Sequence, residues 1–78
     1  MMSVQRSYRL GVRAAMAENT GDDDGSAVLF RQVMYTATDL VRRGERDQAN
    51  TICASFEAGR LDTLYREERA TGGVEPGM

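Results

Sequence analysis

The chain has no histidine, no lysine and no tryptophan, and only one cysteine among its 78 residues. A single cysteine cannot form an intramolecular disulfide, and a structural zinc site without histidine has almost no ligands. Catalysis is also disfavoured, because acid–base chemistry most often uses histidine and covalent catalysis would have only one thiol. The sequence therefore predicts a protein that is not an enzyme and that binds no metal or cofactor.

Long apolar runs are lacking as well. No stretch approaches the roughly 20 consecutive apolar residues that a membrane span requires, and no apolar segment typical of a signal peptide follows the first residues. We therefore expect an unexported, cytoplasmic protein with no membrane contact. All ten basic residues are arginine, a bias typical of GC-rich genomes such as those of many bacteria and phages.

Large apolar side chains are few. Valine, leucine, isoleucine and phenylalanine account for 14 of the 78 residues, about 18%, which is just below the level of an ordinary core. A net charge of only −2 argues against disorder, so a folded chain is the better interpretation. A chain of this size gains little stability from its own core. We therefore expect self-association, with part of the core shared between copies.

Three helical patterns follow one another along the chain. The first covers residues 3–18, with Ser3 as N-cap, and it places four residues on one face: Val4, Tyr8, Val12 and Ala15. Gly11 weakens the middle of this helix by about 1 kcal/mol relative to alanine. The glycine indicates either a close backbone contact or a helix that forms only when it is docked.

The second and third patterns predict the structural centre. A helix over 26–43 carries an apolar stripe of Phe30, Val33, Ala37 and Leu40, widened by Met34 and Val41. A helix over 47–69, with Asp47 as N-cap, carries a stripe of Ala49, Ile52, Cys53, Phe56, Gly59 and Thr63. The short link between them predicts an antiparallel αα-hairpin. We expect Cys53 to be an inert core thiol.

The third helix has a second apolar strip roughly opposite Phe56. Its members are Ala54, Ala58, Leu61 and Tyr65. Either the first helix or another copy of the chain must cover this strip, because one partner helix cannot pack on both sides. The sequence thus predicts an all-α protein, a single domain over 1–70 with a flexible tail over 71–78, that assembles as a homodimeric helical bundle.

The acidic turn over 21–25 has two interpretations. In the first, its aspartates cap the following helix and complement the positive end of its dipole. In the second, the turn is a calcium loop with Gly25 at the sixth position. That alignment places Thr20 at the first position and Arg31 at the twelfth, where the bidentate glutamate belongs. Because a cation replaces this ligand, capping is favoured.

The strongest functional signal is a stripe of three arginines. Arg6, Arg9 and Arg13 lie within about 60° of one another on the first helix. Guanidinium groups in line can contact phosphates or an acidic protein groove, although they can equally form a solvated outer face. The acidic balance of the whole chain, with a pI of about 5.0, makes any nucleic-acid binding weak.

Two classes of function remain. The first is a small helical protein that binds a larger protein stoichiometrically, as an adaptor or an inhibitor, such as a phage- or plasmid-encoded inhibitor of host defence. The second is a nucleic-acid-binding regulator that uses the arginine stripe. The predicted partner-binding residues are Arg6, Arg9, Arg13, Leu61 and Tyr65.

Overall fold

A computed structural model describes the backbone of residues 2–70 and the side chains of residues 2–66. Within that part of the chain the fold is all-helical, as predicted: α1 spans Val4–Asn19, α2 spans Asp23–Arg42 and α3 spans Arg46–Ala70. The predicted tail over 71–78 lies outside the described residues. Over residues 2–70, no helix combines the length and apolar character needed to cross a bilayer.

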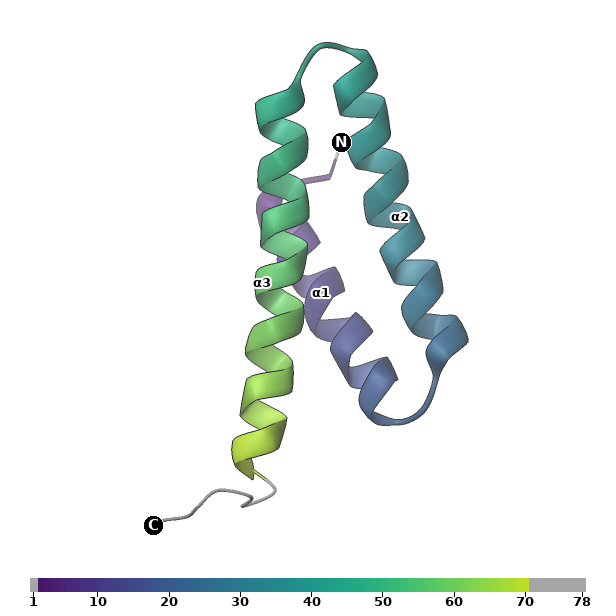
Figure 1. Ribbon diagram of the computed structural model, residues 1–78, viewed down its shortest axis with the longest axis vertical. Helices are drawn as coiled ribbons and strands as arrows, with labels where there is room; N and C mark the ends of the chain where they lie inside the picture. The colour runs from purple at the N-terminus through teal and green to yellow at the C-terminus, as the bar shows by residue number, and fades with distance from the viewer. Residues whose placement is uncertain (1, 71–78) are drawn as a thin grey trace.

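The three helices lie side by side with short links (Figure 1). The chain descends through α1, returns through α2 and descends again through α3, so that α1 and α3 run in the same general direction and cross. Gly21 and Gly44, in the two links, have φ values of 81° and 82°. Side chains other than glycine rarely adopt this backbone conformation, which explains the glycine in each turn.

Helix starts follow local capping chemistry. Ser3 is the N-cap of α1, as predicted, and its Oγ accepts a hydrogen bond from the backbone N–H of Arg6 at 3.0 Å. Asp22 caps α2 by accepting from the N–H of Gly25 at 2.9 Å, so α2 begins at Asp23 rather than at the predicted residue 26. The prediction of Asp47 as the N-cap of α3 was wrong, because the helix already begins at Arg46.

The buried core combines residues from all three helices. The predicted stripes of α2 and α3 are confirmed at most positions. The core cluster consists of Leu10, Ala14, Val33, Ala37, Leu40, Ala49, Ile52 and Phe56. Three members of the predicted α2 stripe are not in the core, since Phe30, Met34 and Val41 are 52%, 42% and 45% exposed.

The prediction for the inner face of α1 was right at Ala15, which is buried, and wrong at the other three positions. Val4 is 47% exposed, and Tyr8 and Val12 are only half-buried, whereas Ser7 and Gly11 are buried. The true inner face is rotated by about one residue step of 100° from the predicted one. The physical reason is that α1 approaches α3 through its smallest side chains instead of its largest.

A close backbone contact joins α1 to α3. A methyl group added at Gly11 would overlap the backbone carbonyl of Phe56, and one added at Gly59 would overlap the carbonyl of Tyr8. The contact at Gly11 confirms one of the two predicted reasons for this glycine. Gly59 was expected to face α2, and the structure places it against α1 instead.

Two serines extend the same contact by one helical turn. Ser7 Oγ donates to the carbonyl of Ile52 at 2.7 Å, and Ser55 Oγ donates to the carbonyl of Val4 at 2.7 Å. Each helix thus presents a serine and, four residues later, a glycine. Each contacting residue of α1 corresponds to one of α3 whose number is 48 higher, as Ser7 corresponds to Ser55 and Gly11 to Gly59. The crossing of α1 and α3 therefore has a local pseudo-two-fold symmetry.

We predict that Gly11→Ala destabilises the protein. Alanine normally stabilises a helix interior by about 1 kcal/mol relative to glycine. Here its methyl group would force the two backbones apart, at a typical overpacking cost of about 1–3 kcal/mol. Thermal and urea denaturation followed by circular dichroism measure the effect. Gln5→Ala, at an exposed position of the same helix, is the control, and a G11A variant more stable than wild type would contradict the described contact.

Candidate binding surfaces

The arginine face consists of Arg6, Arg9 and Arg13 on the outer side of α1. All three are exposed, and the buried Ser7 and Gly11 lie on the opposite side of the helix. Within residues 2–66 none of these arginines forms an ion pair or a side-chain hydrogen bond. Their guanidinium groups are thus available to a carboxylate or a phosphate group.

The outer strip of α3 is the second predicted surface. Leu61 and Tyr65 are 52% and 59% exposed, and Ala54 and Ala58 are exposed as well. Helix α1 packs on Gly59 instead of this strip, so the possibility that α1 covers it is excluded. The arginine face and the outer strip belong to different helices, α1 and α3, and both are exposed.

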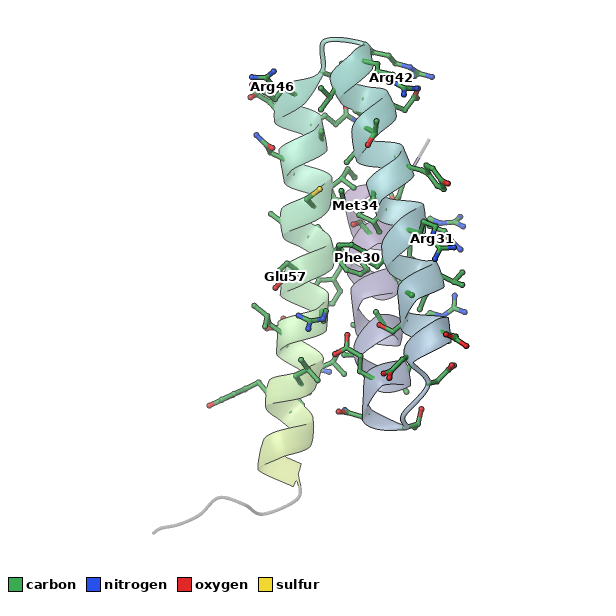
Figure 2. All side chains as sticks on the ribbon, turned by 45° about the vertical axis from the view of Figure 1, so that its right-hand side comes forward. Phe30, Arg31, Met34, Arg42, Arg46 and Glu57 are labelled. Atoms are coloured by element: carbon green, nitrogen blue, oxygen red, sulfur yellow. The ribbon has the colours of Figure 1, made fainter. Side chains whose placement is uncertain are left out.

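A third surface lies between α2 and α3, on the side that α1 does not cover. Phe30, Met34 and Val41 of α2 are all between 40% and 55% exposed. Figure 2 shows Phe30 and Met34 directed into the space between the two helices, whereas Arg31 points away from it. The ring of Phe30 meets that of Phe56 with centroids 5.8 Å apart. This surface, completed by Cys53 and Glu57 of α3, is called the open face below.

Cys53 lies within the open face. Its side chain is half-buried and packs against the core, and it lines a shallow cavity with Met34 and Val41. Cys53 was predicted to lie in the core, and the structure places it at the edge of the core.

An ionic cluster at one end of the molecule ties the three helices together. Arg60 of α3 donates from Nε to Glu18 of α1 at 2.9 Å, and Ser26 of α2 donates to the same carboxylate at 3.2 Å. The hydrogen bond to Glu18 is the main reason why the pKa of Arg60 is raised. Sequence reasoning missed this cluster, because 42 residues separate Glu18 from Arg60.

The same cluster walls a broad groove with a volume of about 720 Å³. Phe30 and Phe56 form part of its lining, together with Glu57, whose carboxylate lies 3.5 Å from Arg60. The charged side chains of the groove are thus largely engaged with one another. Their arrangement is that of a structural ion-pair network.

The acidic turn serves the start of α2. Asp22 is the N-cap, and Asp23 and Asp24 occupy the first turn, where negative charge complements the helix dipole. Among the described residues, no three histidine, cysteine, aspartate or glutamate side chains are placed to hold a metal ion.

No protein-family model, curated protein or solved structure matches this chain. The assignment of a function therefore rests on the surfaces themselves. Guanidinium groups can bind anionic groups, and half-exposed apolar side chains on a helix can be buried in a partner.

A polar contact borders the outer strip of α3. Tyr8 Oη donates to Asp62 Oδ2 at 2.7 Å, and this hydrogen bond is the main reason why the pKa of Tyr8 is raised above 10.0. A raised pKa means that the fold favours the protonated phenol. The stabilising contribution is therefore present below pH 10.0 and is lost as the pH rises through the pKa of Tyr8 in the folded protein.

We predict that Asp62→Asn lowers the pKa of Tyr8 toward 10.0, because the neutral amide no longer opposes ionisation of the phenol. A pH titration of the Tyr8 ring resonances by NMR measures the shift, with Asp47→Asn in the first turn of α3 as the control. An unchanged Tyr8 pKa in D62N would show that Asp62 does not accept a hydrogen bond from the Tyr8 phenol.

Proposed function

We propose that this protein is a non-enzymatic binding protein that acts stoichiometrically on a larger protein partner, as an adaptor or an inhibitor. The observation that carries the proposal is the outer strip of α3. Leu61 and Tyr65 are more than half exposed on a helix whose opposite side is already packed. Large apolar side chains presented in this way are typical of helices that bind in the groove of another protein.

The spacing of the outer strip supports this mode of recognition. Ala54, Ala58, Leu61 and Tyr65 follow one another at intervals of four, three and four residues, which keeps them on one side of α3. The two alanines let a partner backbone approach closely, and the two large side chains provide anchors. We propose that these anchors fill pockets on the partner.

The arginine face gives the proposed partner a second characteristic. Exposed charges at the edge of an interface accelerate association and select a partner of opposite charge. We propose that Arg6, Arg9 and Arg13 contact an acidic area of the partner protein. The absence of ion pairs at these three arginines within the described residues supports this role.

The proposal includes the assembly and the setting of the protein. We propose that α2 and α3 act as an αα-hairpin and that two copies form a homodimeric helical bundle, because the open face leaves apolar side chains of α2 half-exposed. We place the protein in a cytoplasm, where a free thiol such as Cys53 stays reduced. The arginine bias favours a bacterial or phage origin, and an inhibitor of host defence fits such a small binding protein.

We predict that Leu61→Ser combined with Tyr65→Ser abolishes capture of the protein partner. Loss of two anchor side chains typically weakens an interface by about 2 kcal/mol or more each. Affinity purification from the source cells, with mass spectrometry, compares wild type with the double variant. Tyr35→Ser is the matched control, because Tyr35 is 71% exposed on α2 and lies outside the outer strip. Equal recovery of the same partner with the double variant would refute the role of the strip.

The alternative function is a nucleic-acid-binding regulator. The specific observation in its favour is again the arginine face, whose three exposed guanidinium groups lie along one helix without an ion pair in the described part of the chain. Three phosphate contacts would give weak, salt-sensitive binding. The salt dependence of binding therefore distinguishes the two functions. Added salt would weaken binding to nucleic acid strongly, whereas it would weaken binding of the apolar strip in a protein groove much less.

We predict that replacing Arg6, Arg9 and Arg13 with glutamine weakens partner binding while leaving the fold intact. Surface substitutions of this kind usually change stability by less than about 0.5 kcal/mol each. With a protein partner, the main change is a slower association rate, measured by surface plasmon resonance. With duplex DNA, the slope of log affinity against log salt would become shallower by up to roughly three units. Unchanged binding would make the arginine face a solvated surface only.

A further inference from the structure

The open face carries two regular rows of side chains. Residues 23, 27, 30, 34, 37 and 41 of α2 follow at intervals of four and three, and so do residues 46, 50, 53, 57, 60 and 64 of α3. This alternation keeps each row on one side of its helix, as in the seam of a helical bundle. Two cavities, one beside Phe30 and one beside Met34, lie along these rows.

The two rows differ in chemistry. The α2 row has an apolar centre formed by Phe30, Met34 and Val41, which are 52%, 42% and 45% exposed. The α3 row begins with a basic residue, Arg46, and carries an acidic one, Glu57, three helical turns later, followed by Arg60, whose guanidinium lies 3.5 Å from the Glu57 carboxylate. Figure 2 shows Arg46 and Glu57 well separated along α3. A partner suited to this face must provide an apolar helix, an acidic group opposite Arg46 and a basic group opposite the half-exposed carboxylate of Glu57.

We infer that a second copy of this chain is that partner and that it docks through the same face, turned by a two-fold axis perpendicular to the helices. This inference rests on the homodimeric assembly proposed above and specifies its geometry. In this dimer α2 packs antiparallel to α2 of the second copy, and α3 packs antiparallel to α3 of the second copy. Arg46 faces Glu57 of the second copy, and Glu57 faces Arg46 of the second copy. The symmetric dimer therefore contains this ion pair twice.

A single position of the two-fold axis is consistent with the pairing of both rows. On α2, pairing Phe30 with Val41 of the second copy places the axis between residues 35 and 36. Phe30 packs beside Phe56. Because α2 and α3 run in opposite directions, the axis position between residues 35 and 36 of α2 lies beside residues 50 and 51 of α3. On α3, pairing Arg46 with Glu57 places the axis between residues 51 and 52. The two positions agree to within one residue, about 1.5 Å along a helix.

The other two-fold arrangement is disfavoured by charge. An axis parallel to the helices would place α2 of one copy against α3 of the other, at the same level along the molecule. Arg46 lies at the same end of the molecule as Arg42 (Figure 2), so this axis would bring Arg46 toward Arg42 of the second copy. Like charges facing each other destabilise an interface. Only the perpendicular axis joins the apolar centres and matches the charges.

The antiparallel dimer leaves the predicted partner-binding residues outside the pairing rows. The arginine face belongs to α1, which lies on the other side of the α2–α3 pair from the open face. Each dimer therefore presents two arginine faces and two copies of Leu61 and Tyr65.

The test uses charge reversal in the full chain. Sedimentation equilibrium of wild type at micromolar concentration should show a dimer. Arg46→Glu alone and Glu57→Arg alone should each raise the dimer dissociation constant by about tenfold or more, because each variant creates two like-charge pairs. An equimolar mixture of the two variants should recover wild-type affinity, since each mixed dimer contains two restored ion pairs. Circular dichroism confirms that both variants are folded.

Met34→Glu tests the apolar centre independently, with Tyr35→Glu on the outer side of α2 as the matched control. The geometry requires M34E to be a folded monomer and Y35E to remain a dimer. A wild type that is a monomer would overturn both this inference and the proposed homodimer. A dimer that withstands both charge reversals, or that is not restored by mixing, would overturn only the antiparallel geometry. A dimer dissociated by Y35E and not by M34E would move the interface to the outer side of α2.

Discussion

The structure depends on how closely the backbone of α1 can approach that of α3. At Gly11 and Gly59 no side chain separates the two helices, so each glycine lies against a carbonyl of the opposite helix. The serines one turn away donate hydrogen bonds to two further carbonyls. A shift of either helix by one residue would break both hydrogen bonds and press a larger side chain into the contact. The contact therefore fixes the crossing point and the rotation of α1 together.

The exposed surfaces follow from this contact. Because Ser7 and Gly11 face α3, the arginines on the opposite side of α1 must face solvent. Because α1 occupies one side of the α2–α3 pair, the other side remains open, with Phe30 and Met34 half-exposed. The cluster of Glu18, Ser26 and Arg60 holds the three helices together at one end of this arrangement. The candidate binding surfaces are thus consequences of where α1 docks.

The sequence predicted the parts that depend on local chemistry and on large side chains. Periodicity located three helices, capping residues located the starts of α1 and α2 to within three residues, and the apolar stripes identified Val33, Leu40, Ile52 and Phe56 as core. The inner face of α1 was misassigned, because hydrophobic periodicity gives weight to Val4 and Tyr8 and almost none to serine and glycine. Small residues reveal a close approach only when the opposite helix is known. The ion pair between Glu18 and Arg60 could not be predicted from the sequence for a similar reason, because it depends on tertiary geometry alone.

The contact between α1 and α3 also separates what must stay the same from what can change. Four small residues, Ser7, Gly11, Ser55 and Gly59, set the crossing, and their neighbours on the outer sides of the helices take no part in it. Substitutions among the outward-facing arginines or along the outer strip of α3 therefore change the exposed surface without disturbing this contact. The proposed recognition surfaces and the structural contact are thus carried by different residues of the same helices, an arrangement that would let the surfaces change with a partner while the fold stays the same.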